Sequence, residues 1–197
     1  MINSLSQHLA KHLYETSIIT ESDMELYAYG FFVLISRIIF LIVSVIFGII
    51  FNIVIESILF YILFSFIRSY AGGIHAPTEI LCTIFTISSL FMSVLSIKLM
   101  LNYGDQRIAF VVYFISLIII IILSPLDTKE KPLNSNEKKC FKVKTYAVLI
   151  VIILISITAM VFHKINIFYS SLMSLVLESI LLLSGKIKYV INPNEKY

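Results

Sequence analysis

Charged residues are scarce in this sequence: they make up 14% of its 197 residues, against about 25% in soluble domains. Apolar residues are correspondingly abundant at 59%, against about 45–50% in soluble domains. A soluble domain of this length cannot hide such a share of apolar surface in one core. The composition therefore predicts that the chain folds in a lipid bilayer.

Other scarcities exclude several classes of function. The two cysteines, Cys82 and Cys140, form no disulfide framework. A net charge of +3 and the lack of a basic stretch interleaved with aromatic residues argue against nucleic acid as a partner. No metal-ligand spacing, phosphate-binding loop or nucleotide motif is present, so no cofactor is expected. His8 and His12 have the spacing of half a metal site, but no cysteine or carboxylate completes it.

Residues 1–30 form an amphipathic N-terminal segment. Apolar residues recur in it at steps of three and four: Ile2, Leu5, Leu9 and Leu13. This spacing is typical of a helix that lies on a membrane surface, or of a soluble helix packed on a neighbour. Thr20 and Asp23 have the spacing of a capping box, which predicts a second helix leading into the first span. Acidic residues interrupt residues 1–26, so no cleavable signal peptide is expected.

The rest of the chain predicts an all-α, polytopic membrane protein. Six apolar segments are each close to the ~20 residues that a helix needs to cross the bilayer: 31–51, 53–70, 80–101, 108–124, 146–162 and 167–184. The second segment carries Glu56 near one end, and a partly re-entrant path is an alternative for it. No internal repeat or linker is visible, so residues 1–197 are expected to form a single integral-membrane domain.

The distribution of lysine and arginine predicts the orientation of these spans. With the N-terminus in the cytoplasm, eleven of these residues fall on the cytoplasmic side and three outside: Lys98, Arg107 and Lys164. Residues 68–82 and the Lys-rich loop 125–145 then share the cytoplasmic face. We expect a multi-pass membrane protein with its N-terminus and this face in the cytoplasm.

Residues 68–82 are the most chemically diverse part of the chain. Pro77 fits the first turn of a helix, which places Cys82 little more than a turn inside it. There the helix dipole favours a thiolate. Gly72 and Gly73 permit a turn that folds His75 back toward this helix start. Without that turn, a continuous helix would hold His75 and Cys82 roughly 10 Å apart, too far for direct proton transfer.

Plainer interpretations exist for each of these residues. A lone cysteine in a span is often an apolar filler, and a histidine at a membrane edge is often interfacial. Arg68 has the position of a snorkelling anchor. Cys140 has no histidine near it in the sequence, and we interpret it as a bystander.

The pattern Arg68-x4-Gly73-x-His75-x6-Cys82 resembles the signature of the accessory gene regulator B (AgrB) family. Members of that family are bacterial membrane peptidases that process the precursor of a quorum-sensing autoinducing peptide. The loop Pro125-Leu-Asp-Thr-Lys-Glu-Lys131-Pro132-Leu133 is similar to the family's Pro…Lys-Pro-hydrophobic loop. The loop departs from the commonest family sequence at Asp127 and Thr128, where many members carry Pro and Asn.

The resemblance implies a cysteine endopeptidase in which His75 removes the thiol proton of Cys82. The Cys82 thiolate then expels the precursor's C-terminal tail and leaves a thioester, which a peptide side chain converts to a thiolactone or lactone. Substrate positioning is implied for six further residues: Arg68, Gly73, Glu79, Lys129, Lys131 and Pro132. Plainer roles are a helix-start charge for Glu79 and, for the lysines, attraction to anionic lipid.

The expected partners are a precursor peptide, the lipid bilayer and, as an option, a second copy of the chain. The rival interpretation is a small-peptide transporter or a membrane scaffold without catalysis. A transporter should carry charged residues inside several spans, lining a path. The sequence offers only Arg37, Glu56 and Glu178, which is little support for a path.

Overall fold

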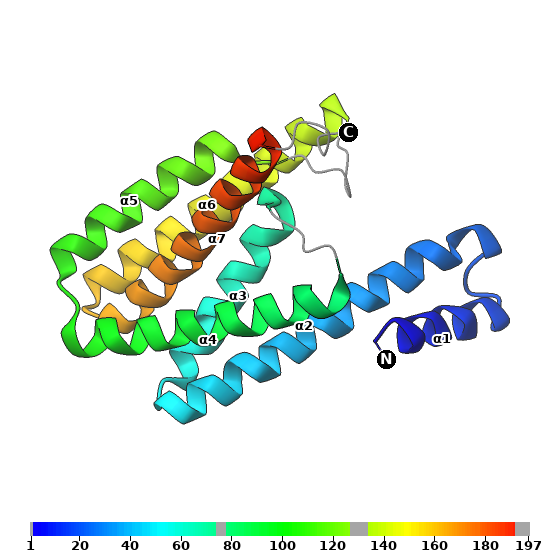
Figure 1. Cartoon of the computed structure of the whole chain (residues 1–197), viewed down its shortest axis with the longest axis horizontal. Coiled ribbons are helices and arrows are strands. Elements are labelled where there is room, and N and C mark those ends of the chain that lie inside the picture. Colours follow the sequence, from blue (N-terminus) through cyan, green and yellow to red (C-terminus); the bar gives the residue numbers. More distant parts are fainter. Residues whose placement is uncertain (1, 74–77, 127–133, 192–197) are drawn as a thin grey trace. The chain divides into compact units, whose positions relative to one another are not determined.

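The computed structural model describes residues 2–73, 78–126 and 134–191, and every regular element within these ranges is a helix (Figure 1). This confirms the predicted all-α class. The chain divides into two compact units, residues 1–43 and residues 44–197.

The first unit contains α1 (Ile2–Glu15) and the beginning of α2 (Met24–Phe51), which runs back in the opposite direction (Figure 1). A short 3₁₀ turn, Glu21–Asp23, leads into α2. The predicted capping box is present, since the Thr20 N–H and hydroxyl both donate to the Asp23 carboxylate, at 3.4 and 2.6 Å. The first unit thus confirms both helices predicted for the N-terminal segment.

The buried face of α1 differs from the predicted apolar stripe. Ser6 and Ala10 are fully buried, whereas Leu5 is 50% exposed. Ile2 and Leu9 are half-buried. Close helix packing selects small side chains over large ones. The exposed part of the apolar stripe stays available to a membrane surface, and that location of α1 stays a prediction.

The second unit contains the remainder of α2 and five further helices: α3 (Val54–Ala71), α4 (Glu79–Tyr103), α5 (Gln106–Leu123), α6 (Ser135–Val161) and α7 (Ile165–Ile191). Helices α2 to α7 are all long and apolar enough to cross a membrane, which confirms the six predicted spans. The second span is one continuous 18-residue helix, α3, which favours a full crossing over the partly re-entrant alternative.

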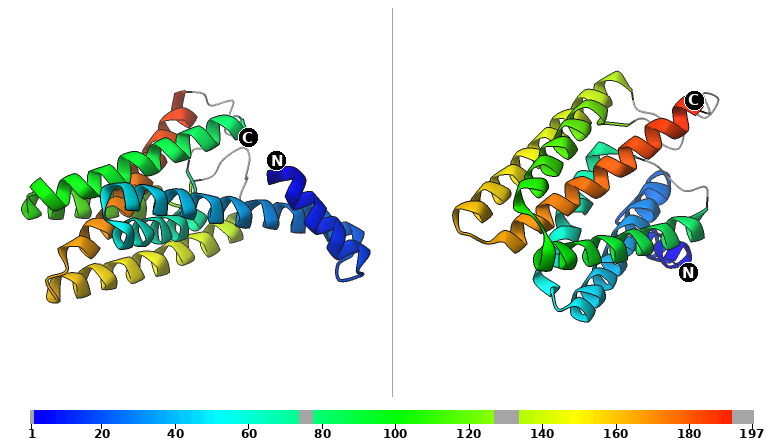
Figure 2. Two further views of the ribbon diagram at one scale, coloured as in Figure 1. Left: turned by 90° about the horizontal axis from the view of Figure 1, so that it is seen from below. Right: turned by 60° about the vertical axis from the view of Figure 1, so that its left-hand side comes forward.

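Helix α7 forms the centre of the second unit. It packs against α3, α4, α5 and α6 (Figure 2). Of its most apolar stretch, 67% of the residues are buried, against 11–33% in the other five spans. Serines at its buried positions allow close helix approach in a membrane protein: Ser170, Ser171, Ser174 and Ser179. Any group buried in α7 therefore influences most of the bundle.

The largest difference from the predicted boundaries is at α6, which begins at Ser135 instead of residue 146. Asn134 caps it, and the Asn134 N–H donates to Glu137 Oε2 at 2.8 Å. Hydropathy registers only the apolar part of a helix, so it missed these polar first turns. Residues 135–145, which were expected to belong to the Lys-rich loop, are therefore part of α6.

Candidate active site

The last turn of α3 leads into an unusual backbone turn at Gly72 and Gly73. Their φ angles are +80° and +134°, in the region that side chains with a Cβ rarely adopt. A Cβ at Gly72 would also lie 2.6 Å from the carbonyl oxygen of Leu126. A Cβ at Gly73 would overlap the guanidinium of Arg68. Both positions thus require glycine, in agreement with the turn predicted for them.

This turn is bonded to the segment that follows α5. The Leu126 N–H donates to the carbonyl oxygen of Ala71 at 2.9 Å, and Gly72 and Leu126 form an isolated β-bridge. The two chain segments that carry the predicted site residues therefore begin side by side. The described parts that meet here lie at one end of the bundle, as a shared face requires; that this face is cytoplasmic stays a prediction.

Arg68 connects the same turn to the centre of the bundle. Its Nη1 donates to the carbonyl oxygen of Gly72 and lies 3.9 Å from Oε1 of Glu178 on α7. Its side chain is 23% exposed, and that of Glu178 is fully buried. Arg68 is thus packed into the fold, in contrast to the snorkelling anchor considered from sequence.

The beginning of α6 completes this end of the bundle. The Lys144 ammonium lies 5.6 Å from the ring centroid of Tyr70 and 5.8 Å from that of Phe141. The Lys142 ammonium lies 5.7 Å from the ring centroid of Tyr146. These are cation–π distances. They place positive charge of the Lys-rich segment beside Tyr70, which is in the last turn of α3.

Cys82 lies in the first turn of α4, as expected. Thr78 is the N-cap, and its Oγ1 accepts from the Leu81 N–H at 3.3 Å. The Cys82 N–H donates to the carbonyl oxygen of Thr78 at 3.0 Å. The side chain of Cys82 is exposed. The thiol thus lies near the start of a helix, on a side of α4 that no other described helix covers.

The helix that carries Cys82 begins at Glu79, slightly later than the sequence predicted from Pro77. Residues 74–77 connect Gly73 to Thr78. A fully extended chain of this length spans at most about 18 Å. His75 and Pro77 lie outside the described residues, as does the predicted fold-back of His75. The same holds for Lys129, Lys131 and Pro132, and the side chain of Glu79 is likewise not described.

Two further carboxylates in the spans have identified partners. Glu56 Oε1 accepts a hydrogen bond from Asn166 Nδ2 at 2.8 Å, which joins α3 to α7 at the end away from the turn. Glu178 pairs with Arg68. Sequence reasoning counted Glu178 only as weak evidence for a transport path. A lone acid in an apolar span is a signal in the sequence that could have singled out Glu178 as a candidate functional residue.

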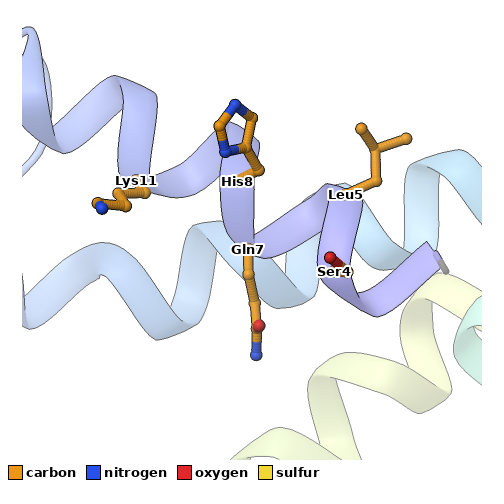
Figure 3. Close-up of a pocket in the computed structure, with 5 residues that line it drawn as sticks. All are labelled: Ser4, Leu5, Gln7, His8 and Lys11. Atoms are coloured by element: carbon orange, nitrogen blue, oxygen red, sulfur yellow. The ribbon is translucent and has the colours of Figure 1, made fainter.

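A shallow surface depression of about 500 Å³ lies on α1 (Figure 3). Five residues line it: Ser4, Leu5, Gln7, His8 and Lys11. Gln7 and His8 point in opposite directions, so these side chains do not converge on a common ligand (Figure 3). In the part of the chain that the structure describes, no three side chains of His, Cys, Asp or Glu are grouped to hold a metal ion.

Six membrane-spanning helices with an exposed thiol at a helix start define a multi-pass membrane protein with a candidate nucleophile. Comparison with known proteins agrees with this. The model of the family Accessory gene regulator B matches residues 2–182, and the chain belongs to that family. Membership links the protein to accessory gene regulator quorum sensing, in a family known for peptide processing.

Two relatives come from Clostridium perfringens. The AgrB-like protein 2 of strain 13 / Type A is 26% identical over 149 residues, which cover 71% of this chain and 67% of the relative. The AgrB-like protein of strain SM101 / Type A is 26% identical over 192 residues, covering 92% and 87%. No solved structure matches the chain significantly.

Proposed function

We propose that this protein is a membrane-embedded cysteine endopeptidase that removes the C-terminal tail of a quorum-sensing peptide precursor and promotes its cyclisation. The main support is the exposed thiol of Cys82 in the first turn of α4. Cys82 follows shortly after the Gly72–Gly73 turn in the sequence. Leu126 is bonded to the residue before that turn, and Arg68 links the turn to Glu178 on α7. Family membership supports a precursor peptide as the substrate class.

In the proposed mechanism, His75 removes the thiol proton of Cys82, and the thiolate attacks one peptide carbonyl of the precursor. The carbon–nitrogen bond breaks, and the leaving amine takes the proton from His75. The remaining peptide is then a thioester of Cys82. A cysteine or serine side chain of that peptide attacks the thioester, releases the Cys82 thiol and closes a thiolactone or lactone ring.

The second step requires that water attack the thioester slowly. Exchange of one thioester for another is close to neutral in free energy, so hydrolysis of the Cys82 thioester would otherwise prevail over ring closure. A site at the membrane edge, where lipid lies against the exposed side of α4, limits water in this way. Arg68 and Gly73 shape the site through the turn after α3, and Glu79 begins the helix of Cys82.

We place the site on the cytoplasmic side, because lysine and arginine are concentrated at that end of the spans. Lys129, Lys131 and Pro132 belong to the segment that begins beside the turn. The lysines there and on α6 supply positive charge for an acidic precursor tail.

The two exposed cysteines provide a matched test of this proposal. A short reading frame beside its gene is first sought, encoding a precursor peptide with an amphipathic segment, a Cys or Ser, and an acidic tail. The protein is then produced together with that precursor. Cys82→Ala and His75→Ala should each abolish tail release without loss of membrane insertion, whereas Cys140→Ala should retain it. Cys82→Ser should keep at most a trace, because a hydroxyl is a weaker nucleophile at neutral pH. Tail release by Cys82→Ala would refute the proposal.

A further inference from the structure

Glu178 is an ionisable side chain at the centre of the membrane-spanning bundle. It is fully buried in α7, and among the described residues neither of its carboxylate oxygens has a hydrogen-bond partner. An ion pair of 3.9 Å joins it to Arg68 on α3. Burying a carboxylate among apolar helices is costly, so an acid at such a position indicates a task beyond packing.

The Arg68 guanidinium links Glu178 to the turn after α3. The nitrogen that faces Glu178, Nη1, also donates to the Gly72 carbonyl oxygen. The same nitrogen lies so close to Gly73 that a Cβ there would overlap it. One nitrogen of the guanidinium thus lies near both the buried acid and the turn. A guanidinium directs several N–H groups at fixed angles, which a lysine ammonium does not do.

The turn sets the direction in which the chain leaves α3 toward Cys82. Gly72 and Gly73 have positive φ angles that few other residues adopt. The preceding residue, Ala71, is bonded to Leu126. The backbone of the turn is thus held from two sides, by Arg68 and by Leu126. Among the described residues, Arg68 is the side chain that links Glu178 to this turn.

We infer that Glu178 is a positioning residue: its carboxylate holds the Arg68 guanidinium against the Gly72–Gly73 turn. This fixes the start of the segment that leads to the Cys82 thiol. The inference rests on the proposed function, because the task it assigns to Glu178 belongs to the proposed peptidase site. It also gives Arg68 a role inside the fold in place of direct contact with the substrate.

Glu56 supplies a matched control for this role. It is an acid on the same pair of packed helices, since it accepts from Asn166 of α7. It lies twelve residues before Arg68 on α3, about 18 Å along the helix axis. Glu56→Gln therefore removes the same charge from the same helix pair without reaching the turn.

The experiment measures membrane abundance together with kcat and KM of precursor tail release. Glu178→Gln should lower kcat by up to about 100-fold, because a misplacement of about 1 Å has that effect. KM should stay within about twofold, since no substrate contact is removed. Glu178→Asp should recover part of kcat, and Glu56→Gln should behave as wild type. A merely structural role would lower abundance and leave kcat per folded molecule unchanged.

A double variant tests whether Glu178 acts through Arg68. Arg68→Met/Glu178→Leu should lose as much kcat as Arg68→Met alone and no more, because the second change removes nothing further from the same chain of contacts. Replacing both charges by apolar groups is also tolerated in many buried pairs. This variant therefore decides the question if Glu178→Gln fails to accumulate.

The outcomes separate the inference from the proposed function. Wild-type kcat in Glu178→Gln or in the double variant, with Cys82→Ala inactive, overturns the inference and leaves the proposed function standing. Fully additive losses from Arg68→Met and Glu178→Leu also overturn it. Tail release by Cys82→Ala overturns the proposed function. The coupling between Arg68 and Glu178 can still be measured in the same assay, so the two failures are distinguishable.

Discussion

The main-chain N–H of Leu126 donates a 2.9 Å hydrogen bond to the carbonyl oxygen of Ala71. This bond joins the segment after α5 to the last turn of α3, although the two are distant in the sequence. Both segments carry residues of the family's motifs, and both begin at this contact. Packing of the bundle therefore brings the described ends of these two segments together.

The first prediction concerns the glycine that faces Arg68. Gly73→Ala should lower tail release strongly and destabilise the protein by about 1–3 kcal/mol, the cost of a strained backbone position. The added Cβ also overlaps the guanidinium. Gly30→Ala is the control, because a Cβ at Gly30 meets nothing within 4 Å. Equal activity and melting temperature for both variants in detergent would contradict the described turn.

A second prediction tests a contact inside the bundle that is remote from the site. The Tyr113 hydroxyl on α5 bonds Ser156 Oγ on α6 at 3.0 Å, and Ser156 also donates to the Ile152 carbonyl. Tyr113→Phe leaves Ser156 bonded, so it should cost only about 0.6 kcal/mol, the average for such bonds in membranes. Unfolding in mixed detergent measures this, with the 84%-exposed Tyr103 changed to Phe as control. A loss above about 2 kcal/mol would contradict it.

Much of the fold could be predicted from local sequence. Apolar segments of the right length located all six spans, and the Thr20–Asp23 spacing located the turn before α2. The start of α6 was missed because its first turns are polar and resemble a loop in a hydropathy profile. The Asn134–Glu137 spacing was a usable signal that hydropathy does not read.

The candidate site was predictable only in part. The position of Cys82 in the first turn of a helix and the turn at Gly72 followed from local patterns. The contact of Ala71 with Leu126 and the pairing of Arg68 with Glu178 did not, because each depends on how distant helices pack. One sequence contains no direct information on such pairs.

The third prediction concerns orientation. In a background without Cys82 and Cys140, Tyr103→Cys should react with a membrane-impermeant maleimide in intact cells. Ser135→Cys should react only after permeabilisation, since positive charge at that end favours the cytoplasm. Both positions are exposed in the fold, so access depends on the side of the membrane alone. Labelling of Ser135→Cys but not of Tyr103→Cys in intact cells would contradict the predicted orientation and support the opposite one.

The fourth prediction concerns substrate charge. Lys129→Gln and Lys131→Gln should each raise KM for an acidic precursor roughly 2- to 5-fold, as expected for exposed ion pairs. The effect should weaken with added salt. Lys164→Gln, at the opposite end of the spans, is the control. An equal rise in KM for a precursor whose tail acids are replaced by amides would exclude recognition by charge.

The acyl-enzyme tests the proposed chemistry most directly. A precursor whose cyclising cysteine or serine is replaced by alanine can complete only the first step. Intact-protein mass spectrometry should then find the enzyme enlarged by the mass of the precursor without its tail. Neutral hydroxylamine, which cleaves thioesters and leaves amides, should remove the adduct, and Cys82→Ala should form none. Steady release of linear peptide without a trapped adduct would contradict the cyclisation step, and no tail release at all would contradict the peptidase.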